Sequence, residues 1–121
     1  MKKTISILFL GITVAVVAGI SPLSWKATSI NLGQVTVHES NHLNFEFTNT
    51  SNSPITILEA KGSCGCTNVS YPTGQIEPGE TASISADFRS GMIGAFKKNI
   101  RIKTSNSPDY TYLHFTGEVV Q

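Results

Sequence analysis

The sequence is poor in charge, and this already narrows the classes of ligand. Only 14% of its 121 residues are charged, against roughly 25% in an average soluble protein, and the net charge is +1. A net charge this small argues against nucleic acid or an anionic membrane as the main ligand, because binding to either requires concentrated positive charge. The length corresponds to one ordinary domain.

The common catalytic motifs are also missing. The chain has no glycine-rich phosphate loop, no Gly-x-Ser-x-Gly elbow and no His-Glu-x-x-His zinc motif. The only aspartates, Asp87 and Asp109, fall in different segments. His114 stands between apolar neighbours in an expected strand, the position of an outward-facing side chain rather than of a catalytic base. We therefore expect a protein that is not an enzyme.

One long apolar run is present, at the N-terminus. Lys2 and Lys3 precede an uncharged stretch over 5–20, which is the pattern of an export signal. A helix of that length reaches about 24 Å, short of the roughly 30 Å of a membrane core. We expect residues 1–24 to be a signal peptide or an N-terminal membrane anchor. The domain of residues 25–121 is then extracytoplasmic: periplasmic, secreted or anchored in the inner membrane.

Apolar and polar residues alternate through the rest of the chain. Leu43, Phe45 and Phe47 alternate with polar residues, and turn residues such as Pro78-Gly79 separate segments of this kind. A period of two predicts half-buried strands. The expected strands span 29–37, 42–49, 54–60, 66–71, 80–88, 96–104 and 110–120. Seven such strands indicate an all-β, immunoglobulin-like antiparallel β-sandwich, with a small barrel as the alternative.

The two cysteines, Cys64 and Cys66, are separated by a single glycine. A bond between them would close a loop of about three residues and contribute roughly 1.6 kcal/mol before strain is subtracted. So small a ring is a weak stabiliser and is easily reduced. A minor structural disulfide, a redox-active dithiol and a soft-metal site all remain open. So do a bond to another chain and buried free thiols.

Further metal-ligating residues are expected at the same end of the sandwich. If successive strands run in alternating directions, three of the connections lie at the same end of the sandwich. They hold His38 and His42, the two cysteines, and Met92. Thiolate, imidazole and thioether suit copper, so a Cu(I) or Cu(II) site made by Cys64, Cys66, His38, His42 and Met92 is one hypothesis. The alternative is that the histidines are exposed loop residues, that Met92 packs over its loop, and that the protein has no cofactor.

One basic stretch contains Lys97, Lys98, Arg101 and Lys103. Lys97, Arg101 and Lys103 share one parity on an expected strand and therefore one face of a sheet. A solvated sheet face accounts for them, and a patch for an acidic partner is the alternative.

Several short motifs occur in an order that resembles one bacterial family. They are Ile30-Asn-Leu-Gly33, Phe45-x-Phe47-x-Asn49, Ser63-Cys-Gly-Cys-Thr67, Ile76-x-Pro78-Gly-Glu80, Gly94-x-Phe96 and Thr116-Gly117-x-Val119. In this order the chain resembles the bacterial domain of unknown function 1573 family. More broadly, it is similar to the Hydin-like and major-sperm-protein-like group of immunoglobulin-fold domains. The Ser-Cys-Gly-Cys-Thr and Pro-Gly-Glu motifs are its most specific part, while Leu32 stands where the family tends to have an aromatic residue.

The resemblance implies an exported immunoglobulin-like sandwich, and it supplies no activity. It carries Cys64 and Cys66 over as family residues, but His38, His42 and Met92 are not part of the family pattern.

These patterns favour an exported, non-catalytic module that recognises a protein or another envelope component through loops or a sheet edge. Membrane contact is expected only through an uncleaved N-terminal segment. A thiol-redox protein is one alternative; it would need a low-pKa thiol, and Lys61 is the one cation close to the cysteines in the sequence. A copper-binding protein is the other alternative.

Overall fold

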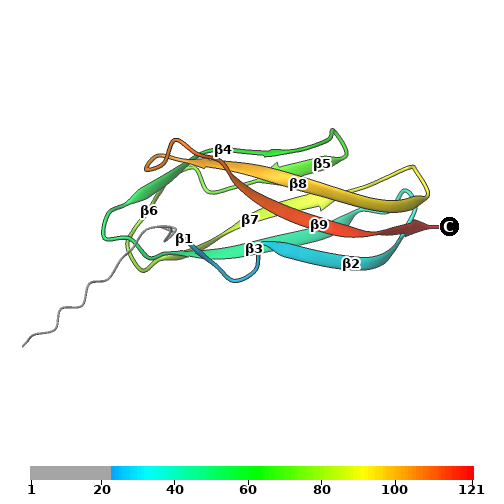
Figure 1. Ribbon diagram of the computed structural model, residues 1–121, viewed down its shortest axis with the longest axis horizontal. Coiled ribbons are helices and arrows are strands. Elements are labelled where there is room, and N and C mark those ends of the chain that lie inside the picture. Colours follow the sequence, from blue (N-terminus) through cyan, green and yellow to red (C-terminus); the bar gives the residue numbers. More distant parts are fainter. Residues whose placement is uncertain (1–22) are drawn as a thin grey trace, which may run out of the picture.

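Two packed β-sheets form the domain (Figure 1). The structure, a computed structural model, describes residues 23–121; the expected signal or anchor segment up to residue 22 lies outside this range. Sheet A has the strand order β1-β3-β7-β5, and sheet B has the order β2-β9-β8-β4-β6. The strands are β1 (Leu23–Trp25), β2 (Ser29–Thr36), β3 (Asn41–Asn49), β4 (Ile55–Gly62), β5 (Thr67–Ser70), β6 (Gln75–Ile76), β7 (Thr81–Phe88), β8 (Gly94–Thr104) and β9 (Thr111–Val120). Within residues 23–121 there is no helix long and apolar enough to cross a membrane.

The all-β, immunoglobulin-like sandwich expected from the alternation is confirmed. All seven expected strands are present. Strands β1 and β6 were not expected, because segments of three and two residues are too short to show an alternation. Leu23 and Ser24, which were expected to precede the domain, pair with Asn49 and Thr48 of β3.

One strand pair departs from the expected antiparallel arrangement. β2 runs parallel to β9, because the chain leaves β1 in sheet A and continues in sheet B without reversing. The crossing is tied to both sheets: the Lys26 N–H donates to the Glu46 carbonyl, and the Thr28 carbonyl accepts from the His114 N–H, at 2.9 and 2.8 Å. Residue periodicity carries no information on strand direction, so the sequence could not reveal this pair.

The apolar faces of the two sheets meet in a single core. Phe88 of sheet A packs against two rings of sheet B, with centroid distances of 4.6 Å to Phe96 and 5.2 Å to Phe115. The largest fully buried apolar side chains are Phe45, Phe47, Phe88, Phe115, Ile55, Ile84, Ile100, Ile102, Leu113 and Val119. The buried residues of β3, β7, β8 and β9 therefore have the parity that the alternation predicts.

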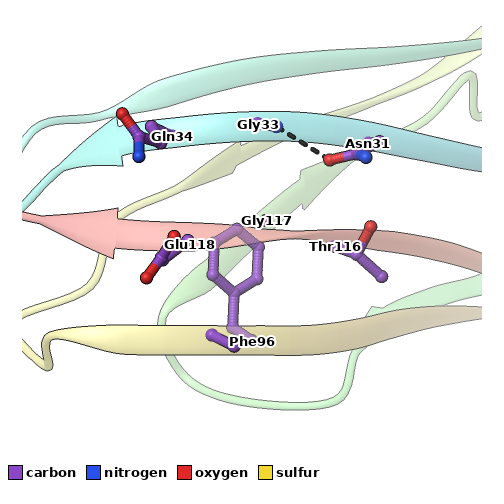
Figure 2. A pocket seen from close by; sticks show the side chains of 8 residues that line it. Asn31, Gly33, Gln34, Phe96, Thr116, Gly117 and Glu118 are labelled. Atoms are coloured by element: carbon purple, nitrogen blue, oxygen red, sulfur yellow. Dashed lines mark hydrogen bonds between the residues drawn. The ribbon is translucent and has the colours of Figure 1, made fainter.

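A bulge in β2 lies opposite a glycine in β9 (Figure 2). Leu32 and Gly33 together face Gly117. Gly33 has a φ of +70°, and its N–H donates to Asn31 Oδ1 at 2.8 Å. A Cβ at Gly117 would lie 2.7 Å from the Gly33 carbonyl oxygen and 2.7 Å from the Phe96 ring. The bulge favours glycine at 33, and the close approach requires glycine at 117.

Asn49, at the end of β3, is a buried polar residue whose hydrogen bonds are all made. Its Nδ2 donates to the carbonyls of Ser53 and Ile76 at 2.9 and 2.8 Å. Its Oδ1 accepts from the N–H and the hydroxyl of Ser51 at 3.0 and 2.7 Å, and its carbonyl accepts from the Gly79 N–H at 2.8 Å. Asn49 thus joins the β3–β4 connection to β6 through its side chain, and the β6–β7 turn through its backbone carbonyl.

Replacing Gly117 by alanine tests the close approach to Gly33 and Phe96. We expect Gly117→Ala to lower the free energy of unfolding by about 1–3 kcal/mol, because the new methyl group meets backbone and a packed ring. Gly74→Ala is the matched control, since an added Cβ there has nothing within 4 Å. Urea denaturation of both variants measures the difference, and equal stability of the two would contradict the packing described.

Replacing Asn49 tests the buried hydrogen-bond hub. Asn49→Ala should lower the free energy of unfolding by about 2–4 kcal/mol, because several buried groups lose their partner at once. Asn68→Ala, at an exposed position of β5, should change it by less than about 0.5 kcal/mol. The account of Asn49 is wrong if thermal denaturation finds the two variants equally stable.

Candidate functional site

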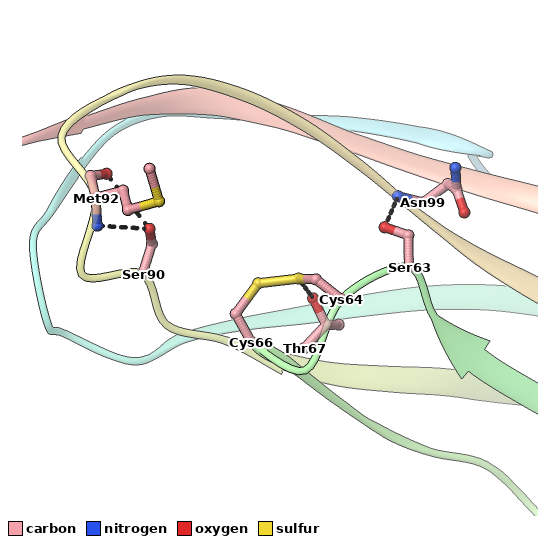
Figure 3. Close-up of a disulfide and its surroundings, with 7 residues drawn as sticks. All are labelled: Ser63, Cys64, Cys66, Thr67, Ser90, Met92 and Asn99. Atoms are coloured by element: carbon pink, nitrogen blue, oxygen red, sulfur yellow. Dashed lines mark hydrogen bonds between the residues drawn. A yellow bond between two sulfur atoms is a disulfide. The ribbon is translucent and has the colours of Figure 1, made fainter.

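Cys64 and Cys66 lie in the loop that carries the chain from β4 in sheet B to β5 in sheet A. Their sulfur atoms are bonded to one another (Figure 3), with the Cα atoms 5.2 Å apart. No free cysteine occurs among residues 23–121. The structure therefore has the intramolecular disulfide that was one of the interpretations left open by the sequence.

Backbone hydrogen bonds hold the disulfide loop to both sheets. The Ser63 N–H donates to the Asn99 carbonyl of β8 at 2.9 Å, and the Arg89 N–H, directly after β7, donates to the Cys66 carbonyl at 3.1 Å. Both cysteines are half-buried, and Cys66 packs against the core. The disulfide thus lies within the loop that connects the two sheets. It does not link strands that are distant in sequence.

The loops of His38 and Met92 lie at the same end as the disulfide. The His38 N–H donates to the Ser90 carbonyl at 2.8 Å. The His38 ring lies so close to Gly91 that a Cβ there would be 2.9 Å from Cε1. The Met92 side chain is 79% exposed at the tip of the β7–β8 loop (Figure 3). The expected gathering of these connections at one end is therefore observed.

The remaining proposed copper ligand, His42, lies on the outer face of sheet A. Its Nδ1 is 3.1 Å from the Asp87 carboxylate, and both side chains are exposed. Across the described range 23–121, no group of three or more His, Cys, Asp or Glu side chains is placed to hold a metal ion. Sulfur in a disulfide is not the thiolate that binds a metal. The copper site therefore stays a prediction about the reduced protein.

The outer face of sheet A carries amide and hydroxyl groups that bond to one another. Asn44 Nδ2 donates to Ser83 Oγ at 3.3 Å, and Asn44 Oδ1 accepts from Ser85 Oγ at 3.1 Å. The hydroxyls of Thr48 and Thr81 are 2.9 Å apart. These groups satisfy one another across β3 and β7.

The outer face of sheet B has a different chemistry. Six of its side chains, which we call the tyrosine–cation patch, are Glu59, Lys61, Arg101, Lys103, Tyr110 and Tyr112. The strand register brings them together, because Lys61 lies opposite Arg101, Arg101 lies opposite Tyr112, and Glu59 lies opposite Lys103. Tyr110 and Tyr112 are 38% and 49% exposed. Lys97 continues the positive charge along β8, as the parity of the basic stretch predicts.

Glu59 fixes the centre of the tyrosine–cation patch. Arg101 Nε donates to Glu59 Oε2 at 2.8 Å, and the Tyr110 hydroxyl donates to Oε1 at 3.5 Å. This hydrogen bond from Arg101, and then the charge of Glu59, raise the pKa of the guanidinium above its ordinary value. The Arg101 guanidinium carbon and Lys103 Nζ are each 5.3 Å from the centre of the Tyr110 ring, within the range of a cation–π contact.

A shallow groove of about 420 Å³ lies further along the same face (Figure 2). It forms where β2, β9 and β8 run side by side. It is lined by Asn31, Gly33, Gln34, Ala95, Phe96, Thr116, Gly117 and Glu118.

Glu59, Tyr110 and Tyr112 were not predicted from the sequence as site residues. The alternation of residues offered one clue to this cluster. Even-numbered residues of β9, such as Tyr112, share a face of the sheet with odd-numbered residues of β8, such as Arg101. Their alignment opposite Arg101 and Lys103 depends on a strand register that the sequence does not state.

Comparison with known proteins gives a family and a fold. Residues 23–119 match the family described as protein of unknown function (DUF1573). None of the curated proteins compared with the chain matches it. PapD-like domain 7 of human CEP192 is similar in structure, with a TM-score of 0.65 and 11% identity over 93% of this chain and 98% of that one.

Two further solved structures are similar. WR4, a C. elegans MSP family member, has a TM-score of 0.57 and 11% identity over 83% of this chain and 99% of that one. A protein of unknown function from Porphyromonas gingivalis W83 has a TM-score of 0.67 and 12% identity over 79% of this chain. The matched region is 46% of that protein, so this chain spans less than half of its length.

At these identities the structural likeness concerns the fold alone, a PapD-like and MSP-like immunoglobulin-type sandwich. The family match, in contrast, covers most of the sequence. The chain belongs to the DUF1573 family, the family that its motifs resemble.

Proposed function

We propose that this DUF1573 chain is an exported, non-catalytic module that binds a protein or another component of the cell envelope. The tyrosine–cation patch is the observation that carries the proposal. Tyrosine and arginine are enriched at protein interfaces and among the residues that contribute most to binding. Here they stand exposed on sheet B, while the polar groups of sheet A are occupied with one another.

Two features support export. Residues 1–24 have the basic start and apolar run of an export signal. The Cys64–Cys66 disulfide agrees with an oxidising compartment outside the cytoplasm.

The sheet edges are less suited to binding than the patch. β1 and β5 are edge strands of three and four residues, which give an added strand little to pair with. The longer edge strand, β2, is interrupted by the bulge at Leu32 and Gly33. A regular added strand would lose its register at that point. We therefore place recognition on the outer face of sheet B.

The disulfide supports a second candidate, a thiol-redox function, because its small ring lies in a half-buried loop that solvent can reach. The two candidates differ in one property of Cys64 and Cys66. A structural disulfide has a reduction potential below about −300 mV, whereas thiol oxidoreductases lie at roughly −270 to −120 mV.

We expect the disulfide to be intact and only weakly stabilising. Alkylation without reduction should leave Cys64 and Cys66 unmodified, with an intact mass about 2 Da below the dithiol form. The Cys64→Ser/Cys66→Ser double variant should lose at most roughly 1.6 kcal/mol of unfolding free energy. A reduction potential within the oxidoreductase range would favour the thiol-redox function instead.

Photo-crosslinking in the native cell tests the proposed function. A photoreactive residue placed at Tyr112 should give crosslinks to an envelope component. The same residue at Asn44, an exposed position on the outer face of sheet A, should give at least about fivefold fewer, because hot-spot residues cluster in one region of an interface.

Two results would contradict the proposed function. One is recovery of the protein only in the cytoplasmic fraction. The other is an absence of crosslinks from position 112 and from every other exposed position tested.

A further inference from the structure

We propose that the tyrosine–cation patch binds an extended acidic peptide segment of a partner protein, with carboxylates at alternate positions. This inference rests on the proposed function and names the chemistry of the partner. The patch is Glu59, Lys61, Arg101, Lys103, Tyr110 and Tyr112.

Charge is segregated on the domain. The tyrosine–cation patch holds three cations and one carboxylate, a net charge of +2. The rest of residues 25–121 holds the other four Lys and Arg residues and seven Asp and Glu residues, a net charge of −3. The electrostatic attraction of an acidic partner is therefore strongest at the tyrosine–cation patch, because the rest of the domain has a net negative charge.

The cations of the patch retain binding capacity. Arg101 uses Nε for Glu59, and its two terminal nitrogens make no hydrogen bond within residues 23–121. Lys61 and Lys103 form no ion pair with a carboxylate within the same range. The guanidinium, held in place by Glu59, thus presents two donors in the fork geometry that binds a carboxylate.

The spacing of the cations fits an extended peptide. Arg101 and Lys103 are two residues apart on β8 and face the same side, so their Cα atoms are separated by roughly 6.6 Å. Carboxylates at positions i and i+2 of an extended chain have the same separation and also share a face. Lys61, opposite Arg101 on β4, lies beside the first carboxylate.

The aromatic rings favour a peptide over an anionic glycan. The Tyr110 ring already contacts Arg101 and Lys103, each 5.3 Å from its centre, which leaves less of the ring to stack on a sugar. Tyr112, 49% exposed, offers apolar surface to the side chains of a peptide. A net charge of +2 is also small for a polyanion such as nucleic acid, whose binding depends on neutralising many phosphates.

NMR titration of the purified processed protein tests the proposal, with a twelve-residue peptide of alternating Glu and Thr as the probe. We expect amide shift changes confined to β4, β8 and β9. A peptide with Gln in place of Glu should bind at least about tenfold more weakly, because it lacks the charge.

Charge-reversed variants give the matched comparison. Lys61→Glu and Lys103→Glu should each weaken binding about fivefold to tenfold, with a folded-protein spectrum retained. Lys26→Glu makes the same change in net charge at a residue that contacts Glu46 of sheet A and is 79% exposed. It should alter binding less than about twofold.

Three results would overturn the proposal. The first is an equal loss of binding in Lys26→Glu, and the second is a set of shift changes centred on β3 and β7. The third is no binding of the Glu–Thr peptide, including the case in which hyaluronate or vesicles of anionic phospholipid bind instead. In each case crosslinks from other surfaces could still uphold the proposed function, so the two can fail separately.

Discussion

The alignment of β8 against β9 depends on one close contact, the Phe96 ring in the space that a side chain at Gly117 would need. These two residues lie opposite each other in the ladder, and the ring is also packed on Phe88 and Phe115 in the core. A shift of one residue would turn every side chain of β8 to the other face of the sheet. The missing side chain of Gly117 also lets the Gly33 carbonyl approach, so the docking of β2 on β9 depends on the same glycine.

The chemistry of the outer surface follows from this register. With Phe96 inward, Ile100 and Ile102 are buried at 0% and 1% exposure. Arg101 and Lys103, the residues that follow them, point outward. Arg101 then lies opposite Tyr112 and within reach of Glu59. The outer face of sheet A has a different chemistry, because it is built from short amide and hydroxyl side chains that form hydrogen bonds with one another. The two outer faces of the sandwich therefore differ: the polar side chains of sheet A bond to one another, whereas sheet B presents cations and exposed tyrosines.

Most of the fold was predictable from the sequence, because strands with one buried face show their period directly. Leu43, Phe45 and Phe47 predicted β3 and its inward side, and all three are buried. Strands β1 and β6 were too short to show a period. The parallel direction of β2 depends on the crossing between the sheets, which leaves no pattern in the residues.

The site was less predictable, because it depends on which residues of different strands lie opposite one another. The nearness of Cys64 and Cys66 in sequence made their disulfide one of the open interpretations. The prediction that the loops of His38 and Met92 lie at the same end as the disulfide needed only alternating strand directions. Predicting the cluster of Glu59, Tyr110 and Arg101 would have required the register of three strands and the conformation of each side chain. Neither can be inferred from a single sequence.

We propose that a partner in the cell envelope covers the tyrosine–cation patch. Hydroxyl-radical footprinting tests this proposal most directly, because tyrosine and methionine side chains are oxidised readily when exposed. In isolated envelopes, oxidation of Tyr110 and Tyr112 should fall well below that in the purified protein, while Met92, 79% exposed on the β7–β8 loop, should be oxidised equally in both. Equal oxidation of the two tyrosines in both preparations, or protection of Met92 alone, would contradict the account.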